Sequence, residues 1–294
     1  MPATQPAVRI AINNILFPTD FSAVSEAALP YATALAAWYD AQVIVAHSVP
    51  LEPVIIPMEP MPLDLNFEWV NAERKMATFA ANHPMPGTRH ETVLQQGELW
   101  DVLSSLIDRH EIDLVVLGTH GRQGLSKLVM GSAAEEIFRR ARCPVLTVGP
   151  KAARDPGEFE NWKTILFATD FSAGSLKALP YALSLAEENE AKLIMLHLVP
   201  LVPIQEQQDI EHAVVERLQS MIPDDAAAWC DPDYLVDFDF PAAGIIRVAE
   251  QRNANVIVMG VHHADKPKRS SHLPWATTHE VVCNAHCPVL TVRG

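Results

Sequence analysis

The sequence is poor in cysteine and in positive charge, and each shortage excludes a class of protein. It has 4 Cys in 294 residues, too few for a disulfide framework. It has 22 Lys and Arg against 36 Asp and Glu, a formal net charge of −14. A surface with that charge repels nucleic-acid phosphates and anionic lipids. The composition therefore predicts a cytoplasmic protein that binds neither nucleic acid nor membrane.

Several signatures are also missing. No apolar stretch is long enough to cross a bilayer, and the N-terminal MPATQPAVRIAINN lacks the charged-then-apolar pattern of a signal peptide. Gly-x-Ser-x-Gly and His-Glu-x-x-His do not occur, so no catalytic residues are predicted from these motifs. The Walker A and Gly-x-Gly-x-x-Gly phosphate-binding patterns are absent too. With 49% hydrophobic and 20% charged residues, the chain has the composition of a globular protein with a core.

What the sequence does contain is an internal repeat. ILFPTDFSAVSEAALPYATALA begins at Ile15, and ILFATDFSAGSLKALPYALSLA begins at Ile165. The two stretches are identical at 16 of 22 positions, and CPVLTV occurs near the end of both halves. A repeat of this length predicts two homologous domains, residues 1–150 and 162–294, joined by a charged linker at 151–161.

Each half alternates strand-like and helix-like segments. In the first half, the expected strands are 10–19, 42–49, 89–96, 112–118 and 144–148, and the expected helices are 22–40, 66–83, 98–111 and 133–142. Ser22 is placed to cap the first helix. Pro30 falls inside that helix and predicts a kink or a later start. Such βαβ alternation predicts a doubly wound parallel sheet in each half.

Polar or glycine residues follow two of these strands. Asp20 comes after the first strand, and the glycine-bearing segment GTHGRQGLSKLVMGS begins at Gly118 after the fourth. If these strands are neighbours, Asp20 faces the loop across the crevice where ligands bind in such sheets. Its carboxylate could accept hydrogen bonds from ribose, and loop N–H groups with a helix N-terminus could hold phosphates. Taken singly, Asp20 could equally be a helix cap and the glycines only turns.

The chain resembles the universal stress protein family across both halves. Nucleotide-binding members of that family carry Gly-x2-Gly-x9-Gly-(Ser/Thr), and Gly118, Gly121, Gly131 and Ser132 have this spacing. The resemblance implies an α/β fold of two tandem five-stranded parallel-sheet domains, similar to the adenine nucleotide alpha hydrolases and paired as an internal pseudo-dimer. It also implies ATP as the ligand, with or without Mg²⁺.

The resemblance further implies which residues contact the nucleotide. The base and ribose contacts would be Pro18, Asp20 and Val43. The remaining contacts, to the phosphates, would come from the loop and the helix after it: Gly118, His120, Gly121, Arg122, Gly131, Ser132 and Ala133.

The second copy of the loop departs from this pattern. Counting back from the shared Cys-Pro pairs, Gly131 aligns with Trp275 and Ser132 aligns with Ala276. Counting forward from the start of the loop, Gly121 aligns with His263. An indole at a position where backbone approaches phosphate should block that approach. We therefore expect one competent ATP site, in the first half.

A metal site in the altered loop is a weaker alternative. His262, His263, His272 and His279 lie near Cys283 and Cys287, and imidazole and thiolate are zinc ligands. The histidines have no fixed spacing, however, and loop histidines are usually solvated while helical cysteine pairs usually belong to the core. No metal ligands are predicted, and metal binding by this loop stays an open question.

The sequence thus predicts a non-enzymatic protein in which ATP is a bound effector that changes conformation or the choice of an unidentified protein partner. A nucleotide-free scaffold and a slow ATPase remain as alternatives. The stress or pathway served, and further pairing of two chains into a homodimer, are left open by the sequence.

Overall fold

The structure, a computed structural model, describes residues 10–51, 67–119, 130–152, 162–223, 230–261 and 274–293. The first half contributes five strands: β1 (Asn14–Pro18), β2 (Gln42–Val49), β3 (His90–Gln96), β4 (Leu114–Gly118) and β5 (Val145–Val148). The second half repeats them as β6 (Thr164–Ala168), β7 (Lys192–Val199), β8 (Asp231–Phe238), β9 (Val256–Val261) and β10 (Val289–Arg293).

Helices connect the strands in the same order in both halves. The first half has α1 (Ala23–Glu26), α2 (Leu29–Tyr39), α3 (Phe67–Asn82), α4 (Leu99–Arg109) and α5 (Ser132–Arg140). The second half has α6 (Ala173–Leu176), α7 (Leu179–Asn189), α8 (Ile204–Gln219), α9 (Pro241–Gln251) and α10 (Pro274–Asn284). Within the described ranges, no helix is both long enough and apolar enough to cross a membrane.

The expected first helix is divided in two. Ser22 caps α1, since its hydroxyl accepts a hydrogen bond from the Ser25 backbone N–H at 3.2 Å. α2 starts at Leu29 with Pro30 in its first turn, where the missing proline N–H costs no helical hydrogen bond. The helix therefore starts late, one of the two outcomes that Pro30 predicts.

Each half of the sheet is parallel and doubly wound. β1 lies between β2 and β4, with Ile15 paired to Val43 on one side and to Leu114 on the other. The chain thus winds outward from β1 to β3 and then returns to place β4 and β5 on the opposite side. The strand order reverses between β1 and β4, so the crevice beyond their carboxyl ends is where such folds bind ligands.

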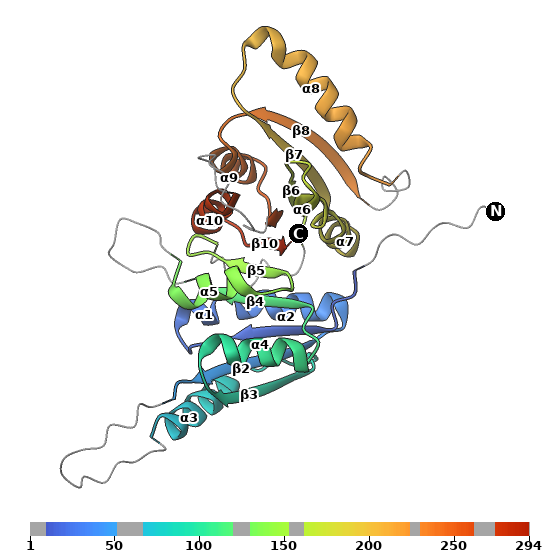
Figure 1. Ribbon diagram of the computed structural model, residues 1–294. Coiled ribbons are helices and arrows are strands. Elements are labelled where there is room, and N and C mark those ends of the chain that lie inside the picture. Colours follow the sequence, from blue (N-terminus) through green and yellow to red (C-terminus); the bar gives the residue numbers. More distant parts are fainter. Residues whose placement is uncertain are drawn as a thin grey trace, which may run out of the picture.

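The two halves join into one ten-stranded sheet, in the order β3-β2-β1-β4-β5-β10-β9-β6-β7-β8. Figure 1 shows β5 and β10 side by side at the centre, between the blue-to-green half and the yellow-to-red half. These two strands are antiparallel, and Leu146 is paired with its repeat counterpart Leu290. The junction therefore has a local pseudo-twofold axis, which is the internal pseudo-dimer expected from the repeat.

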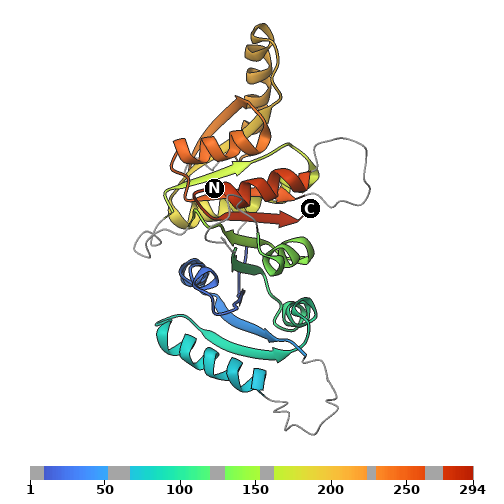
Figure 2. The same ribbon diagram turned by 90° about the vertical axis from the view of Figure 1, so that its left-hand side faces the viewer.

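Helices cover both faces of the sheet, as the second view shows (Figure 2). One apolar core contains side chains of α2, α3, α7 and α8, and the other contains side chains of α4, α5, α9 and α10. Successive strand residues alternate between them: Ile15 and Phe17 belong to the first core, and Leu16 belongs to the second. The continuous apolar runs in the sequence follow from this two-sided burial.

Candidate functional site

A cavity of about 280 Å³ opens at the carboxyl ends of β1, β2 and β4 in the first half. Pro18, Asp20, Gly118 and Ala133, four of the predicted site residues, line it together. Its remaining lining residues come from the same strand ends and from α1, α4 and α5: Thr19, Ser25, Ala46, His47, Ser48, Pro50, Leu99, Leu103, Leu117, Ala134 and Ile137. The walls are mostly apolar with a few convergent polar groups, the usual make-up of a small-molecule site.

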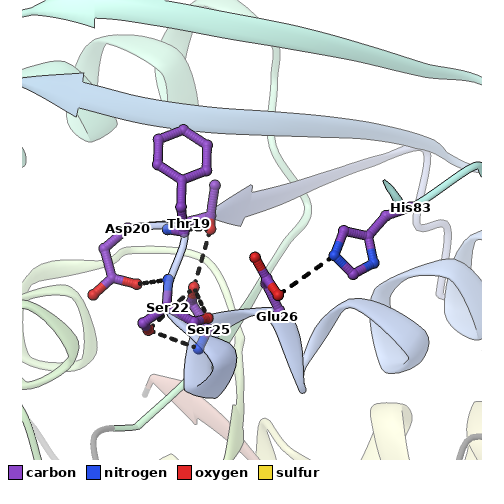
Figure 3. A network of polar contacts seen from close by, with 7 residues as sticks. Thr19, Asp20, Ser22, Ser25, Glu26 and His83 are labelled. Carbon is purple, nitrogen blue, oxygen red and sulfur yellow. Dashed lines mark hydrogen bonds and ion pairs between the residues drawn. The ribbon is translucent and has the colours of Figure 1, made fainter. Parts of the chain in front are cut away.

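The turn after β1 holds Asp20 at the mouth of this cavity. Asp20 Oδ1 accepts a hydrogen bond from the Ser22 backbone N–H at 3.0 Å, and Thr19 Oγ1 lies 3.0 Å from Ser25 Oγ (Figure 3). Thr19 Oγ1 also accepts from the Phe21 N–H at 2.9 Å. Phe21 has a φ of 62°, in the left-handed region that non-glycine residues rarely adopt. The side-chain hydrogen bonds fix this strained turn and therefore the direction of the Asp20 carboxylate.

His47, which is not among the predicted site residues, lines the cavity as well. Its Nδ1 lies 2.7 Å from the carbonyl oxygen of Thr19, so Nδ1 carries the proton and donates it. Its ring packs against the Phe21 ring at a tilt of 43°, with 4.5 Å between centroids. The neighbouring Ser48 lines the cavity as well and was also missed. Both residues follow from the strand direction, because they lie at the carboxyl end of β2.

Val43, in contrast, is not brought to the cavity. It lies at the amino end of β2, is fully buried, and belongs to the apolar core on the face covered by α2 and α3. In a parallel sheet every amino end lies at the edge opposite the ligand crevice. The expected base contact at Val43 is therefore corrected: Ala46, His47 and Ser48 occupy that position in β2.

Gly118 lines the cavity, but close packing also accounts for the glycine. A Cβ at this position would overlap the carbonyl oxygen of Val24 and lie 3.2 Å from the Cα of Ser25. The backbone of α1 can therefore cross β4 closely only if residue 118 has no side chain. Gly260, its repeat counterpart, meets the backbone of Gly174 and Ser175 in the same way.

The N-terminal part of α5 also lines the cavity. Gly131 precedes the helix with φ −63° and ψ 151° and caps it without a side-chain hydrogen bond. Ser132 begins the helix, and Ala133 faces the cavity. The first N–H groups of a helix have no partners within the helix and carry a partial positive charge. Of the other predicted phosphate contacts, His120, Gly121 and Arg122 lie outside the described residues.

The second half repeats the turn almost atom for atom. Thr169 Oγ1 lies 2.9 Å from Ser175 Oγ, and Asp170 Oδ1 accepts from the Ser172 N–H at 3.0 Å. His197 Nδ1 donates to the Thr169 carbonyl at 2.8 Å, and Phe171 has a φ of 60°. The scaffold of the site has thus been kept in both copies, although the loop sequences differ.

No group of three metal-binding side chains occurs among the residues that the structure describes. In α10, Cys283 Sγ lies 3.9 Å from Nε2 of His279, and burial raises the pKa of the Cys283 thiol. His262, His263 and His272 lie outside the described residues. Cys287 is buried at the end of the same segment. Both cysteines belong to the apolar core.

The fold and the cavity define a tandem α/β protein of the doubly wound class, with a ligand-sized cavity where the strand order reverses. The sequence profile described as the universal stress protein family matches residues 11–149 and again residues 161–293. The chain belongs to this family, with two copies of its domain.

Individual relatives agree with this assignment. A universal stress protein of Methanocaldococcus jannaschii is 31% identical over 143 residues, 46% of this chain and 80% of the relative. One of Mycolicibacterium smegmatis is 26% identical over 298 residues, covering 95% of this chain and 96% of the relative. The crystal structure of a universal stress protein from Archaeoglobus fulgidus superposes with a TM-score of 0.70 at 18% identity, covering 97% of this chain and 99% of that one. That likeness extends the shared fold across both halves.

Proposed function

We propose that the first half binds one adenine nucleotide, ATP, in the cavity between β1 and β4, and that the protein acts as a nucleotide-dependent regulatory module in the stress response. The observation that carries the proposal is that Asp20 and the first turn of α5 line one largely apolar cavity. A carboxylate suits ribose hydroxyls, apolar walls suit a base, and helical N–H groups suit phosphate.

The residues present fit this ligand. The walls from Pro18, Ala46, Leu103 and Leu117 are apolar and would enclose the base. The first turn of α5 has no side-chain cap among the described residues, so its N–H groups can donate to phosphate oxygens. Ser132 and the loop residues Gly121, His120 and Arg122 would complete the phosphate contacts by the family motif. Mg²⁺, where present with ATP, would neutralise phosphate charge.

The bound nucleotide would act by its presence rather than by its hydrolysis. Asp20 is the single carboxylate among the described residues that line the cavity, and its Oδ1 already accepts a hydrogen bond within the turn. Within that described lining, no second acid is placed to activate a water molecule. The cavity, with its mixture of apolar walls and convergent polar groups, also favours a ligand site over a purely structural scaffold.

Calorimetric titration of the full chain with ATP, ADP, AMP and GTP tests this function. We expect saturable, adenine-selective binding with about one ATP per chain, because the glycine loop is intact in one half only. Absence of saturable binding would support the scaffold, and two equal sites would contradict the single site. Product analysis over several hours separates a binding protein from a slow ATPase.

A further inference from the structure

The second half has its own cavity at the place that corresponds to the proposed nucleotide site. It measures about 230 Å³ and opens at the carboxyl ends of β6, β7 and β9. Its lining residues are Ala168, Thr169, Asp170, Ser175, Leu196, Leu198, Pro241, Ile245, Met259, Gly260, Thr277 and Thr278. The repeat has therefore kept a ligand-sized space although it has lost the phosphate-binding glycines.

The cavity wall from the second strand has become larger and more apolar. Leu196 stands where the first half has Ala46, and Leu198 stands where it has Ser48. Leu198 packs against Gly244 of α9, where a Cβ would overlap its Cδ1. Met259 of β9 stands where the first half has Leu117 of β4, so this wall stays apolar. These changes favour an apolar ligand body over a polar purine.

The wall next to α10 has lost two of the features that suit an anion in the first half. Trp275 and Ala276 stand at the positions of Gly131 and Ser132, so the close backbone approach and the hydroxyl are absent from the sequence there. Thr277 and Thr278 line the cavity instead of Ala133 and Ala134. Hydroxyls can accept as well as donate, so these two side chains can pair with a hydrogen-bond donor on a ligand as well as with an acceptor.

The carboxylate, in contrast, has been kept. Asp170 lines the cavity and is oriented by the same turn as Asp20, through the hydrogen bond from Ser172 and the left-handed Phe171. An ionised carboxylate has about four acceptor positions. It can therefore hold this turn and still receive a hydrogen bond from a ligand.

We propose that this second cavity binds a small organic amine with an apolar body, its ammonium group at Asp170 and its apolar body against Leu196, Leu198, Ile245 and Met259. Asp170 is the single ionisable side chain among the described residues that line the cavity, and the net charge of the chain is negative, which favours a cation. The volume restricts the ligand to the size of a substituted aromatic ring. The two halves of the protein would then bind two ligands of opposite charge with the same scaffold.

Three probes of equal shape and different charge test this proposal: 2-phenylethylamine, 2-phenylethanol and phenylacetate. The full chain carries methionines labelled with ¹³C in the methyl group, and the Met259 signal is assigned by a Met259→Leu variant. Because Met259 lines this cavity and the first half has Leu117 there, its signal reports on the second cavity alone. We expect a saturable shift with the amine, binding about tenfold tighter than the alcohol, since hydrogen bonds to charged groups are the stronger ones. Phenylacetate should not bind.

A matched pair of variants assigns the charge preference to its residue. In Asp170→Asn the amide oxygen can still accept from Ser172, and the amine should lose its advantage over the alcohol. Asp20→Asn makes the same change in the first half and should leave the Met259 response unaltered. Equal binding of amine and alcohol by the unaltered chain, preference for phenylacetate, or a response that never saturates would each overturn the proposal. ATP binding to the first half can fail or succeed independently of these results.

Discussion

Arg293, in the last strand of the second half, donates hydrogen bonds across the junction to the backbone carbonyls of Phe138 and Arg139 at the end of α5. At the related position of the first half, Gly149 has no side chain, and a Cβ there would lie 2.6 Å from the carbonyl oxygen of Val282 in α10. Val282 is the repeat counterpart of Phe138. Of the two positions related by the pseudo-twofold axis, Arg293 therefore places a cation at the C-terminus of α5, whereas Gly149 places only backbone against α10.

This asymmetry predicts that the second half supports the nucleotide site through α5. A cation at a helix C-terminus is worth about 0.3–1 kcal/mol through the helix dipole. We expect Arg293→Met to lower the free energy of unfolding by about that amount and to weaken ATP binding several-fold, because the N-terminus of the same helix, capped by Gly131, is the proposed phosphate site. Urea unfolding and calorimetry measure the two effects. Lys163→Met removes an exposed cation that lies outside the helices, next to the start of β6, and should change neither.

The register of β5 and β10 predicts how an isolated first half behaves. Thr147 is paired with Val289, and Val145 is paired with Thr291, so each half presents the same pattern to the other. A fragment of residues 1–150 would expose β5 as an unpaired edge, which two copies could cover by pairing around Leu146. We expect a dimer in analytical ultracentrifugation. A Leu146→Pro variant, which cannot complete this pairing, should reduce dimerisation, and a stable monomer of the unaltered fragment at high concentration would contradict the prediction.

The sequence predicts most of the fold because the inner strands of the sheet are buried on both faces. Their continuous apolar runs differ clearly from the amphipathic helices, and the repeat makes each element visible twice. The same repeat carries the signal for the turn at Asp20: Thr19, Ser22 and Ser25 recur as Thr169, Ser172 and Ser175. Residues that recur in this way while loops diverge are candidates for a shared structural network.

The parts that could not be predicted depend on tertiary contacts. Gly118 reads as a phosphate-binding glycine until the crossing of α1 over β4 is known. The resemblance places the base contact at Val43, the wrong end of its strand, whereas strand direction alone would have indicated Ser48. The capping of α5 by Arg293 joins residues more than 150 positions apart, and no local pattern indicates it.

The two glycines at this edge should respond differently to substitution. Gly118→Ala places a methyl group against the Val24 carbonyl, and we expect a loss of about 1–3 kcal/mol of stability from overpacking. Gly131 has a backbone conformation open to any residue, so Gly131→Ala should cost only about 0.5–1 kcal/mol, the difference between Gly and Ala as helix N-caps. Thermal or urea unfolding compares the two variants, and equal losses would contradict the assigned packing role of Gly118.

A bulky substitution at Gly131 tests the proposed nucleotide site directly. Gly131→Trp installs the residue that the second half carries at its counterpart, Trp275. The indole should block phosphate access and abolish measurable ATP binding, while Asp20→Ala should weaken it by removing the ribose acceptor. Calorimetry measures both, with circular dichroism to confirm folding. Unchanged affinity for ATP in Gly131→Trp would show that the nucleotide does not bind against the N-terminus of α5.

His197 predicts a dependence of stability on pH. Burial lowers the pKa of this imidazole below 6.5, outweighing the Thr169 hydrogen bond and the Asp170 charge that act in the opposite direction, and Arg217 adds to the lowering. Below pH 6.5 the unfolded chain therefore binds more protons at this position than the folded chain does. The contribution of His197 to stability is present above pH 6.5 and declines as the pH falls through the lowered pKa.

NMR titration of the His197 Cε1–H signal, assigned with a His197→Gln variant, measures that pKa directly. Urea unfolding of both proteins at about pH 7.5 and about pH 5.5 then isolates its effect, because the other histidines and the carboxylates contribute to both proteins alike. The variant loses the hydrogen bond to Thr169 at either pH, so it should be less stable throughout. Its decline between the two pH values should nevertheless be smaller than that of the unaltered chain. An equal decline in both proteins, or a His197 signal that titrates above 6.5, would show that burial does not control this histidine.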